Sequence, residues 1–213
     1  MNISTKIQVK KKHYFSQKYD SKERWISYWY QIKEVLKLEP KTVLEIGVGN
    51  KTVSDYLKKT GINVTTCDLD KSLKPDVVAD VSKLPFLKNS FDVVLCAELL
   101  EHLPFNKFSK ALSEIYRVTK SMAILTLPHF SITNLYVGIK FIPYIPKKEF
   151  SLKIDFPLKH RFLGEHYWEI GKKGLPLKFV EKKIQKAGFK IQKSFYPKEN
   201  PFHHFFVMKK NAP

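Results

Sequence analysis

Cysteine is scarce in this chain of 213 residues, which has two, and this limits the disulfides and the metal sites that the chain could form. Cys67 and Cys96 end two predicted strands that we do not expect to be neighbours, so we predict no disulfide and interpret both as small core residues. Two distant cysteines also lack the spacing of a zinc site. The adjacent His203 and His204 would point to opposite faces of a strand. We therefore expect no metal ion.

The sequence also lacks an apolar run long enough to cross a membrane. Its longest apolar stretch, residues 130–146, is interrupted by Lys140 and by two prolines, whereas a spanning helix needs about 20 apolar residues. The lysines at 10–12 are not followed by the apolar segment of a secretory signal. These absences predict a cytoplasmic protein whose membrane contact is at most peripheral.

Arginine is rare although positive charge is abundant. The net charge is +18, distributed as +5 in residues 1–40, +2 in residues 41–128 and +11 in residues 129–213, and only three of the 38 cationic residues are arginines. Bidentate recognition of phosphates and bases favours arginine, so nucleic acid is not the favoured partner. The basic flanks favour an anionic acceptor, and an equally simple interpretation is a lysine-rich composition.

The apolar periodicity predicts strands alternating with helices, which is typical of an α/β protein with a doubly wound, mostly parallel sheet. A C-terminal antiparallel hairpin is expected after the last helix. The predicted helices are 21–38, one marked by Val53 to Leu57, one from Pro104 and one near 175–187; the predicted strands are 42–46, 62–67, 76–79, 92–97, 122–127, 189–196 and 202–208.

The most informative stretch is the turn after the first of these strands. Gly47-Val48-Gly49 follows an apolar strand and precedes a helix, and the next strand ends at Asp68. Glycines allow backbone to approach a bound nucleoside closely, and a carboxylate at the second strand end can hold ribose hydroxyls. Three further segments follow along the chain: Asp80, then residues 84–92, then residues 98–103. Together these segments point to a nucleoside-containing cofactor.

These segments, over roughly residues 40–128, resemble the class I S-adenosylmethionine-dependent methyltransferases, in the broad group (type 11-like) that acts mostly on small molecules. The resemblance implies a Rossmann-like fold with seven strands and S-adenosylmethionine as the cofactor. One departure is the glycine loop, where Asn50-Lys51 stands in place of a third small residue. The resemblance implies these cofactor-binding residues: Glu45, Gly47 and Gly49 for the methionine portion, Asp68 for the ribose, Leu69, Asp80 and Val81 for adenine, and Glu98 near the methionine end.

Methyl transfer depends mainly on alignment, and a general base helps only if the acceptor must lose a proton. His102 resembles a family position near the reaction centre, and a structural hydrogen bond is an alternative role for it. His129 and His166 are further catalytic candidates because they lie in the segment that must reach the open strand ends. His160 and Tyr167 belong to the same segment.

We expect one methyltransferase domain over residues 1–213. It comprises an N-terminal helical extension (1–40), a donor-binding core (41–128), an acceptor lid (129–174), where the periodicity lapses, and a C-terminal helix with a strand hairpin (175–213). The predicted activity is methyl transfer to O, N or C of a small, anionic or lipid-linked acceptor. The alternatives are an RNA methyltransferase and a donor-binding domain without turnover. A nicotinamide dehydrogenase fits less well, because Thr52 stands where its fingerprint has glycine.

Overall fold

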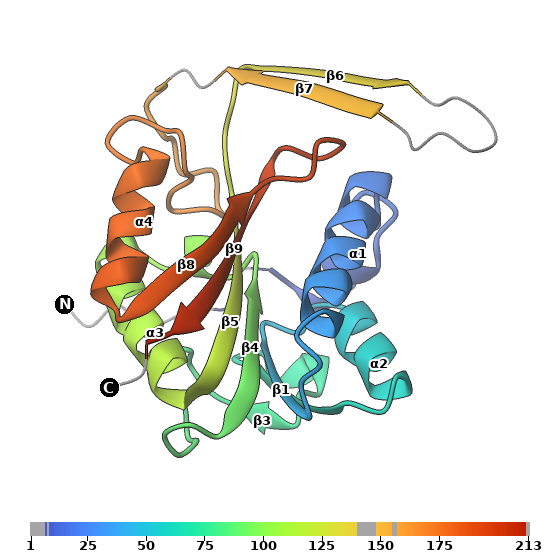
Figure 1. The fold of residues 1–213 in the computed structure, drawn as a ribbon, viewed down its shortest axis with the longest axis vertical. Helices are drawn as coiled ribbons and strands as arrows, with labels where there is room; N and C mark the ends of the chain where they lie inside the picture. Colours follow the sequence, from blue (N-terminus) through green and yellow to red (C-terminus); the bar gives the residue numbers. More distant parts are fainter. Residues whose placement is uncertain (1–6, 8, 140–147, 155–156, 212–213) are drawn as a thin grey trace.

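A seven-stranded sheet runs through the centre of the computed structural model, which describes residues 7, 9–139, 148–154 and 157–211 (Figure 1). The strand order is β3-β2-β1-β4-β5-β9-β8. The first five strands in sequence pair in parallel, and β9 is antiparallel to both β5 and β8. The predicted fold class and the C-terminal hairpin are confirmed. The strands are β1 (Thr42–Ile46), β2 (Asn63–Asp68), β3 (Val77–Val78), β4 (Phe91–Ala97), β5 (Thr119–Pro128), β8 (Phe189–Phe195) and β9 (His203–Lys210).

Helices cover both faces of this sheet, with α1 and α2 on one side and α3 and α4 on the other (Figure 1). Each face buries its own apolar cluster, centred on Val43, Leu57 and Leu95 under α1 and α2, and on Leu112 and Phe206 under α3 and α4. The helices are α1 (Lys22–Leu36), α2 (Thr52–Lys59), α3 (Phe105–Val118) and α4 (Leu177–Lys186), with short 3₁₀ helices η1 (Lys11–Phe15), η2 (Lys71–Leu73) and η3 (Leu100–His102).

Cys67 and Cys96 lie on β2 and β4, which β1 separates, and both thiols are free. The expectation that they form no disulfide is confirmed. Within the described residues, no helix is long and apolar enough to cross a bilayer.

The apolar periodicity of α1 does not match its burial. Trp25 and Trp29 are 52% and 54% exposed, whereas Tyr28 is buried. The helix instead buries Gln31 and Glu34. Glu34 is satisfied there by an ion pair with Lys193 at 2.6 Å, and Gln31 donates to the Ser27 hydroxyl. Because these polar groups have partners, they can occupy positions that periodicity alone assigns to apolar side chains.

The segment in which the sequence shows no regular pattern contains a two-stranded hairpin, β6 (Thr133–Ile139) and β7 (Lys148–Ile154). The hairpin stands away from the main sheet (Figure 1). One of its faces carries apolar side chains that are between 44% and 58% exposed: Leu135, Val137, Ile139, Phe150, Leu152 and Ile154. From the other face, the Lys153 ammonium donates to the backbone oxygens of His129 and Pro201. The polar face of the hairpin therefore attaches to the body of the protein.

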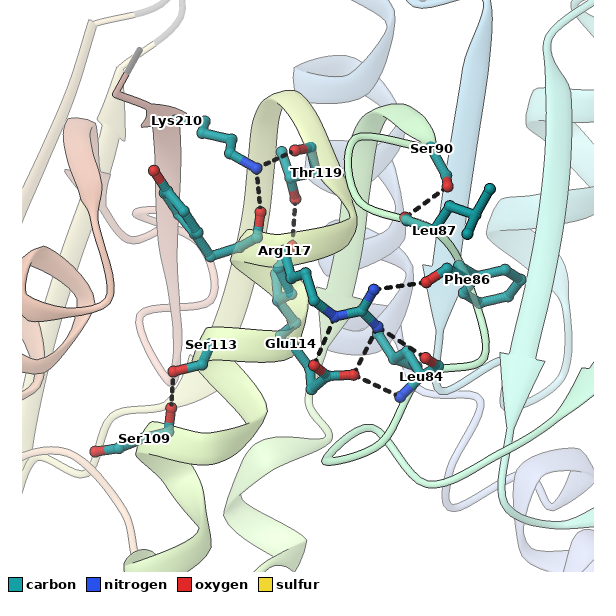
Figure 2. A network of polar contacts seen from close by, with 12 residues as sticks. Leu84, Phe86, Leu87, Ser90, Ser109, Ser113, Glu114, Arg117, Thr119 and Lys210 are labelled. Carbon is teal, nitrogen blue, oxygen red and sulfur yellow. Dashed lines mark hydrogen bonds and ion pairs between the residues drawn. The ribbon is translucent and has the colours of Figure 1, made fainter. Parts of the chain in front are cut away.

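Arg117 on α3 fixes the loop that leads from β3 to β4 (Figure 2). Its guanidinium donates to both carboxylate oxygens of Glu114 and to the backbone oxygens of Leu84 and Phe86, at 2.6–2.8 Å. Glu114 in turn accepts from the Leu84 N–H at 2.8 Å. Charge-assisted, bidentate bonds of this kind hold a fixed geometry, so residues 84–86 are held against α3.

Candidate functional site

The carboxyl ends of β1, β2 and β4 surround a cavity of about 180 Å³. Ligands in doubly wound sheets bind at this edge, near the switch in strand order. Ten of the eleven residues proposed from the sequence line this cavity: Glu45, Gly47, Gly49, Asp68, Leu69, Asp80, Val81, Glu98, His102 and His166. The eleventh, His129, does not.

The glycine loop passes close to two other segments. Gly47 has φ +85°, and a Cβ added there would lie 3.3 Å from a methyl carbon of Leu99. Gly49 has φ +49°, and its added Cβ would lie 3.4 Å from the ring of Tyr14. Both backbone conformations disfavour residues that carry a Cβ. The two glycines therefore keep the loop close to its neighbours and its backbone accessible from the cavity.

Asn50 and Lys51, the departure from the expected loop pattern, have defined structural roles. Lys51 adopts a left-handed conformation with φ +66° immediately before α2, and this is the conformation that a glycine adopts most easily. The Asn50 side-chain oxygen accepts from the Thr52 N–H and from the Tyr28 hydroxyl, both at 3.2 Å. Asn50 thus caps the turn and ties it to α1.

Asp68 connects the glycine loop to the loop that follows β2. Its carboxylate accepts from the Val48 N–H at 2.9 Å and from the Asp70 N–H at 2.8 Å. Burial raises the pKa of the Asp68 carboxyl, and the two backbone donors oppose that change. Because a carboxylate can accept about four hydrogen bonds, Asp68 holds the glycine loop and retains acceptor capacity toward the cavity.

Glu45 on β1 is a buried carboxylate that lines the cavity. One of its oxygens finds no hydrogen-bond partner among the described residues. Burial raises the pKa of Glu45 to about 8, because removal from water disfavours the charged form. A cationic ligand in the cavity would favour the ionised form of Glu45, so this part of the cavity suits a positively charged group.

The opposite end of the cavity carries further buried carboxylates, at the carboxyl end of β4. Glu98 lies 3.4 Å from the Nε2 of His203, and its backbone has φ +48°. Glu101 is fully buried, and neither of its carboxylate oxygens makes a hydrogen bond within the part of the chain that is described. Burial raises the pKa of Glu98 to about 7, and burial with the neighbouring Glu98 charge raises that of Glu101 further.

His102 and His166 meet at this end, with ring centroids 5.1 Å apart. The Nδ1 of His102 lies 3.0 Å from the backbone oxygen of Glu165, and the Nδ1 of His166 lies 3.0 Å from Oε1 of Glu169. A carbonyl oxygen only accepts, and so does an ionised carboxylate, which leaves the Nε2 of each neutral ring as its acceptor nitrogen. Burial lowers the pKa of His102 to about 4, so this ring is neutral near pH 7.

His129 lies outside this cluster. Its Nδ1 is 3.1 Å from the Nδ1 of His204, and the Nε2 of His204 is 2.9 Å from the hydroxyl of Ser194. His129 therefore belongs to the junction of β5, β8 and β9. Of the other residues considered from the sequence, His160 contacts the backbone oxygen of His166 at 2.8 Å. Its direct partner is thus a residue that lines the cavity.

Sequence reasoning missed the N-terminal segment, which covers the donor end of the cavity. His13, Tyr14 and Tyr19 line the cavity together with Arg24. The Tyr14 and Tyr19 rings pack edge-to-face at 5.2 Å, and the Arg24 guanidinium lies 4.5 Å from the centre of the Tyr19 ring. The aromatic residues between 13 and 30 were a signal in the sequence, but their spacing does not identify what they contact.

Comparison with known proteins shows what this part of the chain is similar to. The model of a methyltransferase domain matches residues 44–127, the stretch that supplies α2, β2, β3, β4, α3 and most of β1 and β5. The matched stretch includes the glycine loop, Asp68, Asp80 and the carboxylates at 98 and 101.

The curated relatives each match less than half of the chain. A demethylmenaquinone methyltransferase of Corynebacterium efficiens is 33% identical over 108 residues, which are 46% of each chain. A ubiquinone biosynthesis O-methyltransferase of Hydrogenovibrio crunogenus is 28% identical over 88 residues, 34% of this chain and 36% of that one. The chain therefore spans less than half of the curated relatives it matches.

The solved structures support the fold over a longer stretch. An S-adenosylmethionine-dependent methyltransferase from Clostridium acetobutylicum has a TM-score of 0.59 and 11% identity, over 87% of this chain and 91% of that one. At 11% identity, this similarity supports a shared fold and nothing more specific. Residues 165–169, which contribute Glu165 and His166 to the cavity, lie outside the matched family region.

Proposed function

We propose that the protein transfers a methyl group from S-adenosylmethionine to an oxygen, nitrogen or carbon atom of a small acceptor that is anionic or lipid-linked. The observation that carries the proposal is the convergence of Glu45, the glycine loop and Asp68 on one cavity. These groups occupy the positions that the family resemblance implies for donor binding. The histidines and carboxylates at the other end of the same cavity would then face the acceptor.

The residues of the donor end fit this donor. Glu45 offers a buried, unpartnered carboxylate oxygen to a molecule that carries an ammonium and a sulfonium group. Asp68 offers the remaining acceptor sites of its carboxylate to the ribose hydroxyls, beside a loop whose two glycines leave the backbone accessible. Asp80 and Val81 line the same cavity, and we propose them for the adenine. The donor contains no phosphate, so the site needs carboxylates rather than an anion-binding loop.

The bound donor supplies a methyl carbon whose bond to sulfur breaks as the acceptor atom bonds to it, with the electron pair remaining on sulfur. The residues of this chain would bind both molecules, align them and exclude water, and alignment is a large part of such a rate enhancement. Where the acceptor is a hydroxyl, its proton must also leave. The acceptor nitrogens of His102 and His166 lie at the end of the cavity where that proton would be released.

Two observations support the class of acceptor. Two relatives of the chain are named as a demethylmenaquinone methyltransferase and a ubiquinone biosynthesis O-methyltransferase, names that point to small-molecule acceptors. Most of the positive charge lies outside residues 41–128, in the segments that would surround the acceptor. A basic surround raises the local concentration of anions. We propose residues 129–174 as the lid over this acceptor, since Glu165 and His166 line the cavity.

Donor binding is tested by calorimetric titration with S-adenosylhomocysteine. Asp68→Ala should weaken binding at least tenfold, because each charge-assisted hydrogen bond contributes about 1.5–3 kcal/mol. Asp55→Ala, which changes an exposed carboxylate on α2, is the matched control and should bind like the wild type. Equal affinity in a folded Asp68→Ala variant would reject the donor site.

Turnover and acceptor class need a second experiment. Donor labelled in its methyl group is incubated with a cell extract, which is then separated into RNA, lipid and small-metabolite fractions. Label in the lipid or metabolite fraction supports the proposal. Label that is confined to RNA and removed by ribonuclease would establish the RNA alternative, and donor binding without label in any fraction would establish a domain without turnover.

A further inference from the structure

The cavity is lined by many carboxylates and by one arginine. Of the described residues that line it, only Arg24 is a lysine or an arginine, although the chain carries 38 such residues. The same lining includes seven carboxylates: Glu45, Asp68, Asp70, Asp80, Glu98, Glu101 and Glu165. A molecule bound in this cavity would therefore meet many negative groups and a single guanidinium.

The guanidinium of Arg24 makes no hydrogen bond and no ion pair within the part of the chain that is described. It lies over the ring of Tyr19, 4.5 Å from the ring centre. The backbone of Arg24 is fixed separately, because its N–H donates to the hydroxyl of Ser21 at 3.4 Å at the start of α1. A guanidinium has five N–H donors in a planar fork, and its stacking on an aromatic ring restricts its orientation. These donors are thus held in place and remain available to a ligand.

The neighbours of Arg24 locate it between the glycine loop and the carboxyl end of β4. On one side, the hydroxyl of Tyr19 would lie 3.5 Å from a Cβ added at Gly49. On the other side, burial raises the pKa of Glu98 and of Glu101, and the positive charge of Arg24 opposes this rise in both carboxyls. The glycine loop and Glu98 are the groups that the family resemblance implies for the methionine portion of the donor. Arg24 therefore lies beside the part of the cavity that would hold this portion.

The proposed donor carries one negative group, the α-carboxylate of its methionine portion. The donor-binding residues considered so far offer carboxylates to its ammonium and sulfonium groups and to its ribose, and they give this anion no partner. Removal of a carboxylate from water is costly unless a cation or hydrogen-bond donors replace the water. A guanidinium meets this need best, because it can form two parallel charge-assisted hydrogen bonds with one carboxylate.

We propose that the Arg24 guanidinium binds the α-carboxylate of the donor and that the Tyr19 ring positions it for this contact. This role rests on the proposed function and deepens it, because it makes the cavity selective for nucleosides that carry an amino-acid carboxylate. Arg24 lies outside residues 44–127. The N-terminal segment thus supplies a donor contact that the stretch matching the methyltransferase model does not contain.

A negative group on the acceptor is the alternative partner of Arg24. The position of Tyr19 between Arg24 and the glycine loop favours the donor. The two partners also predict different measurements. If Arg24 binds the donor, its replacement weakens the binding of S-adenosylhomocysteine in the absence of any acceptor, whereas a contact with the acceptor leaves that affinity unchanged.

The test compares two ligands that differ only in the carboxylate. Calorimetry on the full chain measures the binding of S-adenosylhomocysteine and of its decarboxylated analogue, S-adenosyl-3-thiopropylamine, to the wild type and to Arg24→Met. We expect the wild type to bind S-adenosylhomocysteine at least about tenfold more tightly than the analogue, the effect of losing hydrogen bonds to a charged group. Arg24→Met should lose about tenfold or more in affinity for S-adenosylhomocysteine and should bind the analogue like the wild type.

Two further variants separate the shape of the guanidinium from its charge. Arg24→Lys keeps the charge but not the planar fork, so its affinity for S-adenosylhomocysteine should lie between those of the wild type and Arg24→Met. Lys22→Met is the matched control, because it removes a cation from the same turn of α1 whose side chain is exposed and does not line the cavity. It should bind both ligands like the wild type.

Equal affinity of the wild type for the two ligands would overturn the proposal, and this comparison needs no variant. An equal loss for both ligands in Arg24→Met would also overturn it, because Arg24 would then shape the N-terminal segment without binding the carboxylate. Unchanged binding of S-adenosylhomocysteine by Arg24→Met would overturn it in favour of the acceptor. If the wild type bound neither ligand, the donor site itself would be rejected, so failure of the proposed function is distinguished from failure of the role of Arg24.

Discussion

The two ends of the cavity differ in how the chain assembles them. The donor end draws its groups from residues 45–81, where each successive strand ends at the same edge of the sheet. The acceptor end joins residues 98–102 to residues 165–169 and to His203, and the contact between His102 and Glu165 spans 63 positions. Regular local spacing therefore specifies the first end, whereas long-range packing specifies the second.

The largest expected effect tests whether the acceptor end depends on one close backbone contact. Gly171 has φ +85°, and an added Cβ would lie 2.4 Å from the backbone oxygen of Phe130. Gly171→Ala should lower the free energy of unfolding by about 2–5 kcal/mol, from left-handed backbone strain together with steric overlap. The measurement is urea denaturation.

Gly174→Ala is the control for that substitution, because Gly174 has the same φ and its added Cβ would meet no atom within 4 Å. It should cost only the backbone strain of about 1–2 kcal/mol. Equal losses in the two variants would show that the contact with Phe130 does not hold the acceptor end together.

A smaller effect is expected at the donor end, where Arg117 holds the loop that follows Asp80 (Figure 2). Arg117→Met keeps much of the side-chain length but removes the charge-assisted bonds to Glu114, Leu84 and Phe86. The free energy of unfolding should fall by about 1.5–3 kcal/mol. Arg161→Met changes an exposed arginine and should have little effect. If both variants unfold alike, the guanidinium network does not stabilise the loop.

The smallest effect is a proton released when the donor binds. Burial raises the pKa of Glu45 to about 8 in the folded protein. The folded state therefore favours the protonated carboxyl. This contribution to stability is present below the ordinary pKa of a glutamate and is lost as the pH rises through about 8. A cationic ligand favours the ionised form. Calorimetry with S-adenosylmethionine near pH 7, in buffers of different ionisation enthalpy, should therefore detect up to about one proton released.

Glu45→Gln should abolish that release, whereas Glu34→Gln should leave it unchanged, because Glu34 is paired with lysines away from the cavity. Proton release that persists in Glu45→Gln would assign it to another group. Comparison of the two variants thus separates the buried carboxylate of the donor end from ordinary carboxylates of the fold.

The sequence predicted the seven strands of the sheet and most donor-end residues because their patterns are local. The alternation of strand and helix determines which residues reach the edge. Gly47 follows β1, Asp68 ends β2 and Asp80 comes two residues after β3. Burial on α1 was less predictable. Periodicity favoured the face with Trp25 and Trp29, but ion pairs and hydrogen bonds with other segments allow Glu34 and Gln31 to be buried.

The acceptor end could not be assembled from the sequence for a related reason. His102, His129 and His166 were equivalent candidates by residue type, and only packing separates them. His129 joins His204 at the β5–β9 edge, and His166 joins His102 beside Glu101. The hairpin β6–β7 was also missed. Its apolar residues alternate on one face, but they lie in a segment whose flanks show no helical or strand period.

The position of Tyr14 and Tyr19 above Gly49 has a consequence for the rates of exchange. A Cβ added at Gly49 would lie 3.4 Å from the Tyr14 ring and 3.5 Å from the Tyr19 hydroxyl, so a molecule lying on the glycine loop would lie beneath these two side chains. Entry and departure then both require residues of η1 and its neighbours to shift. A barrier common to both directions slows association and dissociation together and leaves their ratio, the affinity, unchanged. For the proposed methyl transfer, we therefore expect the exchange of bound molecules to follow the opening frequency of a short aromatic segment and not the strength with which the cavity holds its occupant.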